Sequence, residues 1–372
     1  MKPIDIWRAT ARAEALGGQP RWRQLAEMAL LRLSAGKIQP DEYFNYRLYR
    51  RDLALAEKRR YLGYWMWDAL YAPNSPDDAA VADSKLASYA LFERSGLPHP
   101  RVRAIVGYGH DYPGAARLAT ADDIAAFART ATYPIFIKPD AGSHGLGAKL
   151  ADGVDDEGLW LRDGSRLTFE ALADAARAGA PVPLIVQDAI EPHPDIRRLT
   201  GGTAATARLY VLNRPDGASV HSAVLRIPVG RAMIDNFHAG RTGNLIAAID
   251  VGTGRCSAAV AGLGFDYRLA DCHPDTGEPI GGLAAPGWAD ACAIVERAAP
   301  LFPGLALQAW DMAFTPDGPT IIEVNAKGEF RILQHALQRG LIDERLREAA
   351  KLRPTLGACK ARGASERQSD QR

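Results

Sequence analysis

The stretch Tyr133–Pro139 (YPIFIKP) is an apolar run that ends in Lys138 and Pro139 and leads directly into the glycine-rich segment Asp140–Gly147 (DAGSHGLG). Glycines let a loop backbone approach phosphate oxygens with its N–H groups, and a cation at the end of the preceding strand adds positive charge. The chain continues as Ala148–Leu150 without the Gly-Lys-Ser/Thr ending of a Walker A loop, so we expect a β-hairpin and not a helix. The stretch predicts a phosphate-binding hairpin, with plain turn chemistry as the alternative.

A second hairpin is predicted by Trp310–Asn325 (WDMAFTPDGPTIIEVN), in which two apolar runs flank a Thr-Pro-Asp-Gly turn. The first run carries Asp311, and Ile321, Glu323 and Asn325 are expected to alternate on one face of the second. Two carboxylates and an amide oxygen would then converge. Such hard ligands suit Mg²⁺, which takes one or two carboxylates and completes its octahedron with water and nucleotide phosphates. The alternative is that these side chains lie on the solvated face of an edge hairpin.

Composition limits the classes of function. The 372 residues are enough for two or three domains. The chain has 45 basic and 44 acidic residues, so its net charge is close to zero. This argues against a nucleic-acid or membrane-surface protein acting through bulk electrostatics, but a local basic patch is still compatible with it. The N-terminus lacks the apolar core of a signal peptide, and no stretch approaches the roughly 18 apolar residues of a membrane span. We expect a cytoplasmic protein without a membrane span or a nucleic-acid partner.

The four cysteines, Cys256, Cys272, Cys292 and Cys359, form no C-x-x-C pair. Scattered reduced thiols fit a cytoplasmic compartment. A zinc site that combines three of them with His273 is a minor alternative.

The N-terminal part of the chain, from about residue 5 to 80, has a helical pattern without the alternation of a strand. Its aromatic-rich segment Tyr61–Trp67 is expected to be core, with a docking surface as the alternative. Asn74–Asp78 is predicted to be a loop before a helix at Asp83–Phe92, and the polar tail from Pro354 to Arg372 is expected to be disordered.

Strands and helices are expected from about residue 100 to 190, with a buried strand at 184–190, and a strand-rich segment follows at 203–255. Within that segment Arg208 and Arg226 alternate with apolar residues, as inward-facing side chains do. A buried arginine costs free energy unless it meets an anion. The two arginines therefore form structural ion pairs or hold an anionic substrate.

From about Asp83 to Leu341 the sequence resembles the ATP-grasp carboxylate-amine ligases. Asp235–Arg241 is similar to a segment of the ribosomal-protein glutamate ligases, whereas the helical N-terminus with its tyrosines resembles the sugar-transfer-associated, α-L-glutamate ligase-like group. The resemblance implies an α+β ATP-grasp fold, in which two α+β subdomains clamp ATP, preceded by a helical region. The implied boundaries are 1–80 for that region and 81–350 for the ATP-grasp domain, with a clamp subdomain at about 100–190 and a catalytic, metal-binding subdomain at about 191–350.

The same resemblance implies roles for individual residues. ATP would be bound by eleven residues: Lys85 and Lys138 at the phosphates and the adenine edge, Gly142, Ser143, His144 and Gly145 at the phosphates, Gln187, Asp188, Ala189 and Ile190 at the adenine, and Asp195 near the ribose. Mg²⁺ or Mn²⁺ would be bound by Asp311, Glu323 and Asn325. Substrate and transferring phosphate would be held by Arg208, Arg226, Asn236 and Arg241, and His238 is either a participant or an ordinary packed histidine.

The function implied is an ATP- and Mg²⁺-dependent ligase that joins a small-molecule carboxylate to an amine through an acyl phosphate, linked to polysaccharide or cell-envelope synthesis. A sugar or peptide acceptor and a homo-oligomer are compatible with it. Standard ligases begin with a Rossmann-like domain that helps to hold substrate, so the helical N-terminus leaves the substrate open. One alternative is a kinase acting on a hydroxyl, with His238 or Asp235 as base. Another is a non-catalytic nucleotide-binding scaffold. No hydrolase motif is recognisable.

Overall fold

The computed structural model describes residues 4–109, 111–142, 147–230 and 235–351. Contacts divide the described chain into two compact units. The helical unit contains residues up to Pro73, Leu263–Asp266 and the chain from Leu337 onward, and the two-sheet unit contains Asn74–Gly262 and Tyr267–Ala336. Among the described residues, no helix is both long and apolar enough to cross a membrane.

The helical unit confirms the helices predicted for the N-terminal region. They are α1 (Ile6–Ala15), α2 (Arg21–Arg32), α3 (Pro40–Asn45), α4 (Leu55–Lys58), η1 (Tyr64–Met66) and α5 (Trp67–Tyr71), joined by η3 (Gly264–Asp266) and α13 (Glu344–Ala349). Its core is aromatic and includes Tyr43, Phe44 and Tyr61. The Tyr61–Trp67 segment, predicted to be core, is only partly buried: Tyr61 and Met66 are buried, whereas Tyr64 and Trp65 are exposed.

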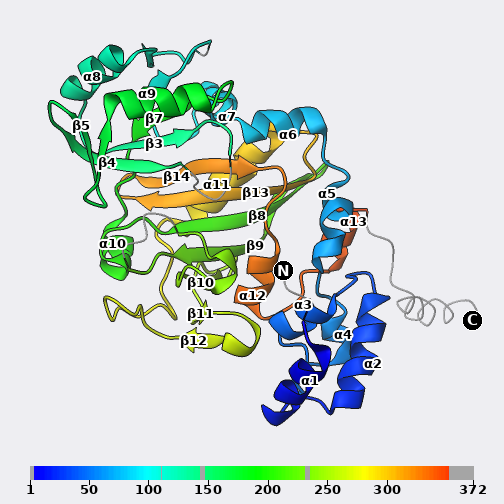
Figure 1. Ribbon diagram of the computed structural model, residues 1–372. Coiled ribbons are helices and arrows are strands. Elements are labelled where there is room, and N and C mark those ends of the chain that lie inside the picture. The colour runs from blue at the N-terminus through cyan, green and yellow to red at the C-terminus, as the bar shows by residue number, and fades with distance from the viewer. Residues whose placement is uncertain (1–3, 110, 143–146, 231–234, 352–372) are drawn as a thin grey trace, which may run out of the picture. The chain divides into compact units, whose positions relative to one another are not determined.

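Sheet A of the two-sheet unit has seven strands. In spatial order they are β2 (Ala116–Leu118), β1 (Val102–Val106), β7 (Leu184–Asp188), β3 (Ile135–Pro139), β4 (Lys149–Val154), β5 (Gly158–Leu161) and β6 (Arg166–Thr168). Because β3 pairs antiparallel with β4, the predicted hairpin around the glycine-rich segment is confirmed. Apolar residues of α8 (Ala121–Thr130) and α9 (Phe169–Ala178) pack on one face of this sheet (Figure 1).

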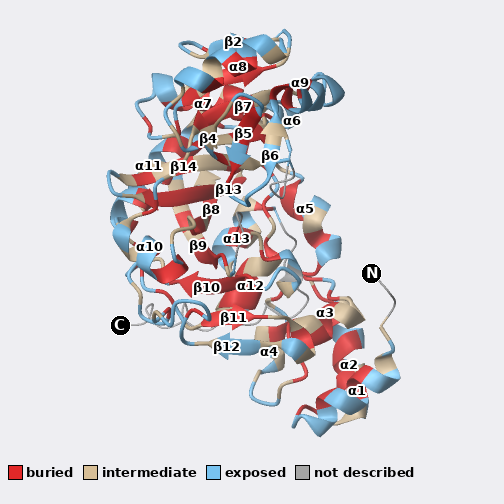
Figure 2. Ribbon diagram, turned by 60° about the vertical axis from the view of Figure 1, so that its left-hand side comes forward, coloured by how far each residue is buried: buried red, intermediate tan, exposed pale blue. Residues whose placement is uncertain are grey.

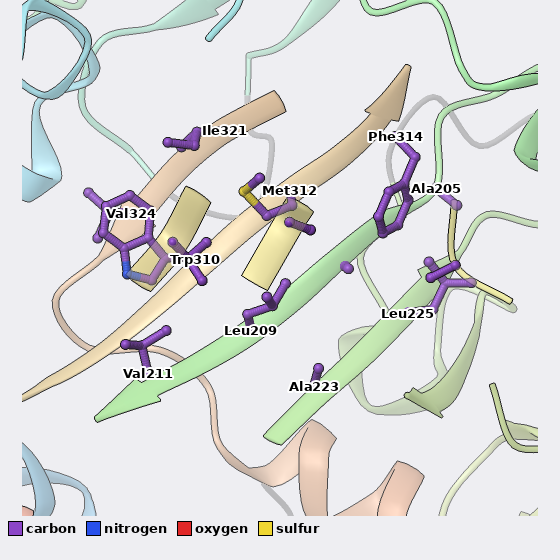
Figure 3. Close-up of a cluster of buried hydrophobic side chains, with 14 of the residues drawn as sticks. Ala205, Leu209, Val211, Ala223, Leu225, Trp310, Met312, Phe314, Ile321 and Val324 are labelled. Atoms are coloured by element: carbon purple, nitrogen blue, oxygen red, sulfur yellow. The ribbon is translucent and has the colours of Figure 1, made fainter. Parts of the chain in front are cut away.

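Sheet B also has seven strands, in the order β12 (Arg268–Ala270), β11 (Ala259–Ala261), β10 (Leu245–Ile249), β9 (Gly217–Ile227), β8 (Thr206–Arg214), β13 (Leu307–Thr315) and β14 (Gly318–Asn325). Strand β13 is buried along nearly its whole length (Figure 2). Since side chains alternate across a strand, one face of the sheet gathers an apolar core around Leu209, Trp310 and Met312 (Figure 3). The other face is left for the charged residues described below.

The remaining helices of the two-sheet unit are α6 (Pro76–Asp83), α7 (Lys85–Arg94), α10 (Pro194–Thr200), η2 (His238–Gly240), α11 (Trp288–Ala298), η4 (Ala299–Leu301) and α12 (Arg331–Leu337), the last residue of which belongs to the helical unit. The loop predicted at Asn74–Asp78 is wrong in its second half, because α6 begins at Pro76. Proline suits the first position of a helix, where its missing N–H is not needed. Tyr89 and Phe92 of α7 and Val295 of α11 pack into the apolar core of sheet B.

A β-bulge corrects the predicted alternation on β14. Asp311 pairs with Glu323, but the next residue, Met312, pairs with Ile321, so Ile322 is an extra residue on this strand. Ile321 consequently joins the apolar core, and Glu323 does not share its face. The prediction that Ile321, Glu323 and Asn325 line one face is therefore wrong for Ile321.

Candidate functional site

The centre of the site is a row of charged residues across three neighbouring strands. Glu323 on β14 lies opposite Asp311 on β13, and Asp311 lies opposite Arg208 on β8. The guanidinium of Arg208 donates two hydrogen bonds to the Asp311 carboxylate, from Nε to Oδ1 and from Nη2 to Oδ2, each 2.7 Å. Planar two-point pairing of this kind is the strong form of an ion pair.

A second arginine reaches the same carboxylate from β9. The Nη2 atom of Arg226 donates to Oδ2 of Asp311 at 3.0 Å, and its Nε lies 3.4 Å from Oδ1 of Asp235. Thr206 links these groups, because its backbone N–H donates to Asp235 at 2.9 Å and its hydroxyl contacts both Asp235 and Arg226. Both predicted inward-facing arginines therefore meet carboxylates, as their burial requires.

The two arginines set the ionisation of the buried acids. Burial alone would raise the pKa of Asp311, but the neighbouring Arg208 and Arg226 hold that pKa well below its ordinary value. Burial also opposes charge on Arg208, yet Asp311 keeps the pKa of its guanidinium above the usual range. For Asp235 the burial effect dominates and raises the pKa of the carboxyl, despite Arg226 and Thr206. Asp311 is thus a fixed anion, and Asp235 is the acid more easily protonated.

Lys85 connects this row to α7. Its Nζ lies 3.6 Å from Oε2 of Glu323 and donates to the backbone oxygen of Asp140 at 3.1 Å. The Asp140 carboxylate accepts from the backbone N–H of Leu86 at 2.8 Å and from the Ser84 hydroxyl at 2.9 Å. Asp140 thereby ties the start of α7 to the end of β3, which brings Lys85 near Lys138.

Lys138 is buried at the end of β3, and its Nζ donates to the hydroxyl of Tyr89 at 3.1 Å. The Tyr89 hydroxyl in turn donates to the backbone oxygen of Ile322, the bulged residue, at 2.6 Å. Burial, together with the charge of Lys85, lowers the pKa of Lys138 to about 7. The strand that carries the candidate phosphate-binding lysine is thus linked through Tyr89 to the strand that carries the candidate metal ligands.

The predicted metal ligands lie together at the end of β14. Asn325 donates from Nδ2 to Oε1 of Glu323 at 3.3 Å, and Asp311 is opposite Glu323. Two carboxylates and the amide oxygen of Asn325 form an oxygen donor set that suits Mg²⁺ better than zinc. Among the described residues no three His, Cys, Asp or Glu side chains gather in a metal-binding arrangement, so the zinc alternative at Cys272 has no support there.

The residues predicted to hold the adenosine follow β7. Gln187 and Asp188 end this strand, opposite Phe136 and Ile135 of β3. The backbone N–H of Ala189 donates to the Pro134 oxygen at 3.3 Å, and Ile190 is half-buried beyond it. Asp188 is paired with Arg103 at 2.9 Å, and Asp195, in the first turn of α10, is paired with Arg198 at 2.7 Å. The described contacts tie both carboxylates to surface arginines.

Other predicted residues lie apart from the charged row or outside the described chain. Arg241 is exposed and donates to the backbone oxygen of His238, and the backbone oxygen of Asn236 accepts from Thr242 and Asn244. His238 is exposed, so its interpretation as a packed histidine is wrong. Gly142 is exposed, with a φ of 145° that favours glycine. Ser143, His144 and Gly145, like the tail 354–372, lie outside the described residues.

Three residues that support the site were not assigned a role from the sequence: Tyr89, Asp140 and Thr206. Each acts through a partner on a distant segment, such as Asp140 with Leu86 or Thr206 with Asp235. For Asp140 the sequence contains one indication of such a role, because this residue directly follows the strand that ends in Lys138 and Pro139.

The model of one protein family, described as sugar-transfer associated ATP-grasp, matches residues 70–351, which are about three quarters of the chain. No significant match to a curated protein was found. Among solved structures, biotin carboxylase from Campylobacter jejuni matches at 12% identity and a TM-score of 0.46, covering 75% of this chain and 47% of that one.

Two further solved structures match at a similar level. N5-carboxyaminoimidazole synthase from Aspergillus clavatus, in complex with ADP and 5-aminoimidazole ribonucleotide, matches at 11% identity and a TM-score of 0.43, with 76% and 54% coverage of the two chains. The ATP-grasp ligase PsnB, with Mg, ADP and a precursor variant, matches at 17% identity and a TM-score of 0.38, with 75% and 59% coverage. This chain thus spans only about half to three fifths of the length of these structures.

Proposed function

Because the chain belongs to the sugar-transfer associated ATP-grasp family, we propose that it is an ATP- and Mg²⁺-dependent enzyme that joins a carboxylate to an amine. The observation that carries this proposal is the row Glu323–Asp311–Arg208, with Arg226 and two lysines close by. Phosphoryl transfer needs positioning and charge neutralisation more than covalent chemistry from side chains. This row supplies carboxylates for a metal and cations for phosphate oxygens.

Lys85 and Lys138 are proposed to bind the phosphates of ATP, together with backbone N–H groups around Gly142. In support, both lysines are buried and mutually repulsive, since Lys85 helps to lower the pKa of Lys138. An anionic ligand would relieve that repulsion. The adenine is proposed to lie along Gln187–Ile190 and the ribose near Asp195.

The donor set fits Mg²⁺. Asp311 is kept ionised and Glu323 lies opposite it. Asn325, whose amide nitrogen donates to Glu323, would add its amide oxygen to the donor set. An ionised carboxylate has about four lone-pair positions, so two hydrogen-bonded arginines leave room for a metal contact on Asp311. When bound, Mg²⁺ would act as a Lewis acid that draws charge from the phosphate oxygens.

The proposed reaction has two steps. A carboxylate oxygen of the substrate attacks the γ-phosphorus of ATP, ADP leaves, and an acyl phosphate forms. The amine then attacks the acyl carbon, inorganic phosphate leaves with the bonding electron pair, and the nitrogen loses a proton to give an amide. Arg208 and Arg226 would neutralise the carboxylate and the transferring phosphate, and Asn236 and Arg241 would contact the substrate. The family description favours a substrate linked to sugar transfer. The link to polysaccharide or cell-envelope synthesis is our proposal.

One observation favours a second candidate, a kinase that phosphorylates a hydroxyl. Asp235 is buried beside Arg226, and burial raises its pKa. A carboxylate with a raised pKa is a better acceptor for the proton of a hydroxyl group. In a kinase of this kind, Asp235 would be the general base.

Hydroxylamine distinguishes the two reactions, because it converts an acyl phosphate into a stable hydroxamate and leaves a phosphate ester intact. The full chain, ATP and Mg²⁺ are incubated with hydroxylamine and a panel of carboxylates, and then with a panel of sugars. The ligase proposal expects hydroxamate together with ADP release, and both should fall sharply in Arg208→Ala. The matched control is Arg162→Ala, which removes an exposed arginine from a two-point pair with Asp152. A stable phosphate ester on a sugar, with no hydroxamate from any carboxylate, would replace the ligase with the kinase.

A further inference from the structure

Helix α2 of the helical unit has its polarity reversed relative to an ordinary surface helix. Its buried positions include two polar side chains and recur at helical spacing: Gln24, Glu27, Met28 and Leu31. Its exposed positions are largely apolar and recur at the same spacing: Trp22, Ala26, Ala29, Leu30 and, at the C-cap, Leu33. Trp22 is 71% exposed and Leu33 is 87% exposed. A surface helix normally turns its apolar stripe toward the core, so the stripe on α2 is available for another contact.

Hydrogen bonds on the buried side fix this orientation. The side-chain Nε2 of Gln24 donates to the backbone oxygens of Thr10 and Gln19, at 3.0 and 2.7 Å. Glu27 is paired with the fully buried Lys58 at 2.6 Å and accepts from the Tyr43 hydroxyl at 2.7 Å. Rotating α2 to bury Trp22 and Leu30 would break these hydrogen bonds and separate the buried ion pair, which is strongly unfavourable. The apolar stripe therefore stays on the surface.

Two more exposed tryptophans lie beside arginines at the two ends of α2. Arg21 lies over the ring of Trp7 at 5.3 Å, and Arg32 lies over the ring of Trp65 at 4.5 Å. Both rings are 65% exposed. We call Trp7, Trp22, Leu30, Leu33 and Trp65 the tryptophan face. A patch this rich in large apolar side chains is typical of an interaction surface.

The charge around the tryptophan face is positive. Arg21, Arg23 and Arg32 accompany the stripe, and Glu27, the sole acid between residues 21 and 33, is buried. Residues 1–73 contain 13 basic and 8 acidic side chains, a net charge of +5, although the whole chain has only +1. A second copy of the chain would place these arginines against one another. An anionic partner is complementary to them.

We propose that the tryptophan face binds the surface of an anionic lipid bilayer. Tryptophan rings have an apolar body and a polar N–H and suit the boundary between headgroups and acyl chains, and arginines beside them pair with lipid phosphates. Helix α2 would lie in the plane of the surface, with Leu30 and Leu33 directed into the acyl boundary. This contact would hold the enzyme proposed above at a membrane surface.

The test uses the full chain with vesicles of phosphatidylcholine alone and vesicles mixed with phosphatidylglycerol, followed by sedimentation and by tryptophan emission. Binding and a blue shift are expected with the anionic vesicles, and both should weaken as salt is raised. Leu33→Glu should reduce binding about tenfold or more, because it places a charge where the exposed leucine is proposed to enter the acyl boundary. The matched control is Leu269→Glu, at a leucine on β12 of the two-sheet unit that is 59% exposed, and this variant should bind as the unaltered protein does.

Three results would overturn the proposal. The first is no binding to anionic vesicles at low salt. The second is binding that Leu33→Glu and Leu269→Glu affect equally. The third is a concentration-dependent dimer, measured by sedimentation equilibrium without lipid and abolished by Leu33→Glu, because the face would then be a contact between copies of the chain. The circular dichroism spectrum of each variant establishes that the helices are intact.

Discussion

Arg208 and Asp311 form a two-point ion pair between directly opposed positions of β8 and β13, with both N···O distances at 2.7 Å. Asp311 is almost completely buried, and Arg226 contacts it as well. The same carboxylate is therefore a structural partner of two buried cations and a candidate metal ligand. These two roles make different predictions.

The structural role predicts a large stability loss for Asp311→Asn. The substitution leaves Arg208 and Arg226 buried beside a neutral amide, and breaking a buried pair in this way typically costs about 3–5 kcal/mol. Urea unfolding of the metal-free protein measures the loss. In the matched control, Asp152→Asn, an exposed two-point pair with Arg162 is weakened, and the expected cost is below about 1 kcal/mol. Equal losses in the two variants would show that Asp311 does not stabilise the fold.

The metal role is tested more cleanly at Glu323, which is partly exposed, accepts a hydrogen bond from Asn325 at 3.3 Å and lies 3.6 Å from Nζ of Lys85. Glu323→Gln removes a negative charge at nearly constant volume, so the unfolding midpoint should change little. Turnover should fall by roughly 100-fold or more, because a metal contributes several kcal/mol to the transition state. Raising the Mg²⁺ concentration should recover part of the activity. A variant with full turnover at low Mg²⁺ would contradict the assignment.

The sequence predicted those parts of the site that depend on local signals. The lysine-ending strand with its hairpin and the hairpin around Asp311 both follow from alternation and turn residues, which act over a few positions. The bulge at Ile322 could not be predicted, because it is a property of the pairing between two strands and not of either strand alone.

Long-range partners explain the other failures. The role of Asp140 depends on Leu86, 54 positions earlier, and the orientation of α2 depends on Lys58 and Tyr43, which lie after it in the chain. A helical periodicity indicates that a helix has two faces. It does not indicate which face is buried when polar residues such as Gln24 and Glu27 find buried partners.

Asp140→Ala should weaken nucleotide binding indirectly, because Asp140 positions Lys85 and does not itself contact the nucleotide. Removing the carboxylate deletes its bonds to Leu86 and Ser84 at the start of α7, at a cost of about 1 kcal/mol in stability. Asp123→Ala, which removes an exposed capping carboxylate at the start of α8, should leave nucleotide affinity unchanged. Calorimetric titration with ADP compares the two variants, and equal affinities would show that the start of α7 does not influence the nucleotide.

The ionisation of Lys138 affects the stability of the fold as well as ligand binding. Its pKa is lowered from 10.5 to about 7 by burial and by Lys85. Between these two values the unfolded chain holds a proton that the folded protein lacks, so this group makes stability rise with pH from about 7 to 10.5. In Lys138→Met that contribution should disappear, which unfolding at a series of pH values would detect as a flatter stability profile.

Nucleotide binding should therefore be coupled to proton uptake. At pH 8 most Lys138 side chains in the free protein are neutral, but a phosphate group beside Nζ favours the charged form and raises its pKa. The complex must then take a proton from the buffer, and nucleotide affinity should fall as pH rises above about 7. Calorimetric titrations in buffers with different ionisation enthalpies measure the number of protons taken up, which should approach one at pH 8 and vanish in Lys138→Met.

The Lys138→Met variant should also bind ATP about 10- to 100-fold more weakly at pH 6.5, where the lysine of the unaltered protein is charged and its hydrogen bond to phosphate is worth roughly 1.5–3 kcal/mol. Lys37→Met, at an exposed lysine of the helical unit, should change neither quantity. If proton uptake persists in Lys138→Met, another group titrates on binding. If the ATP affinity at pH 6.5 is also unchanged, Lys138 does not contact the phosphates.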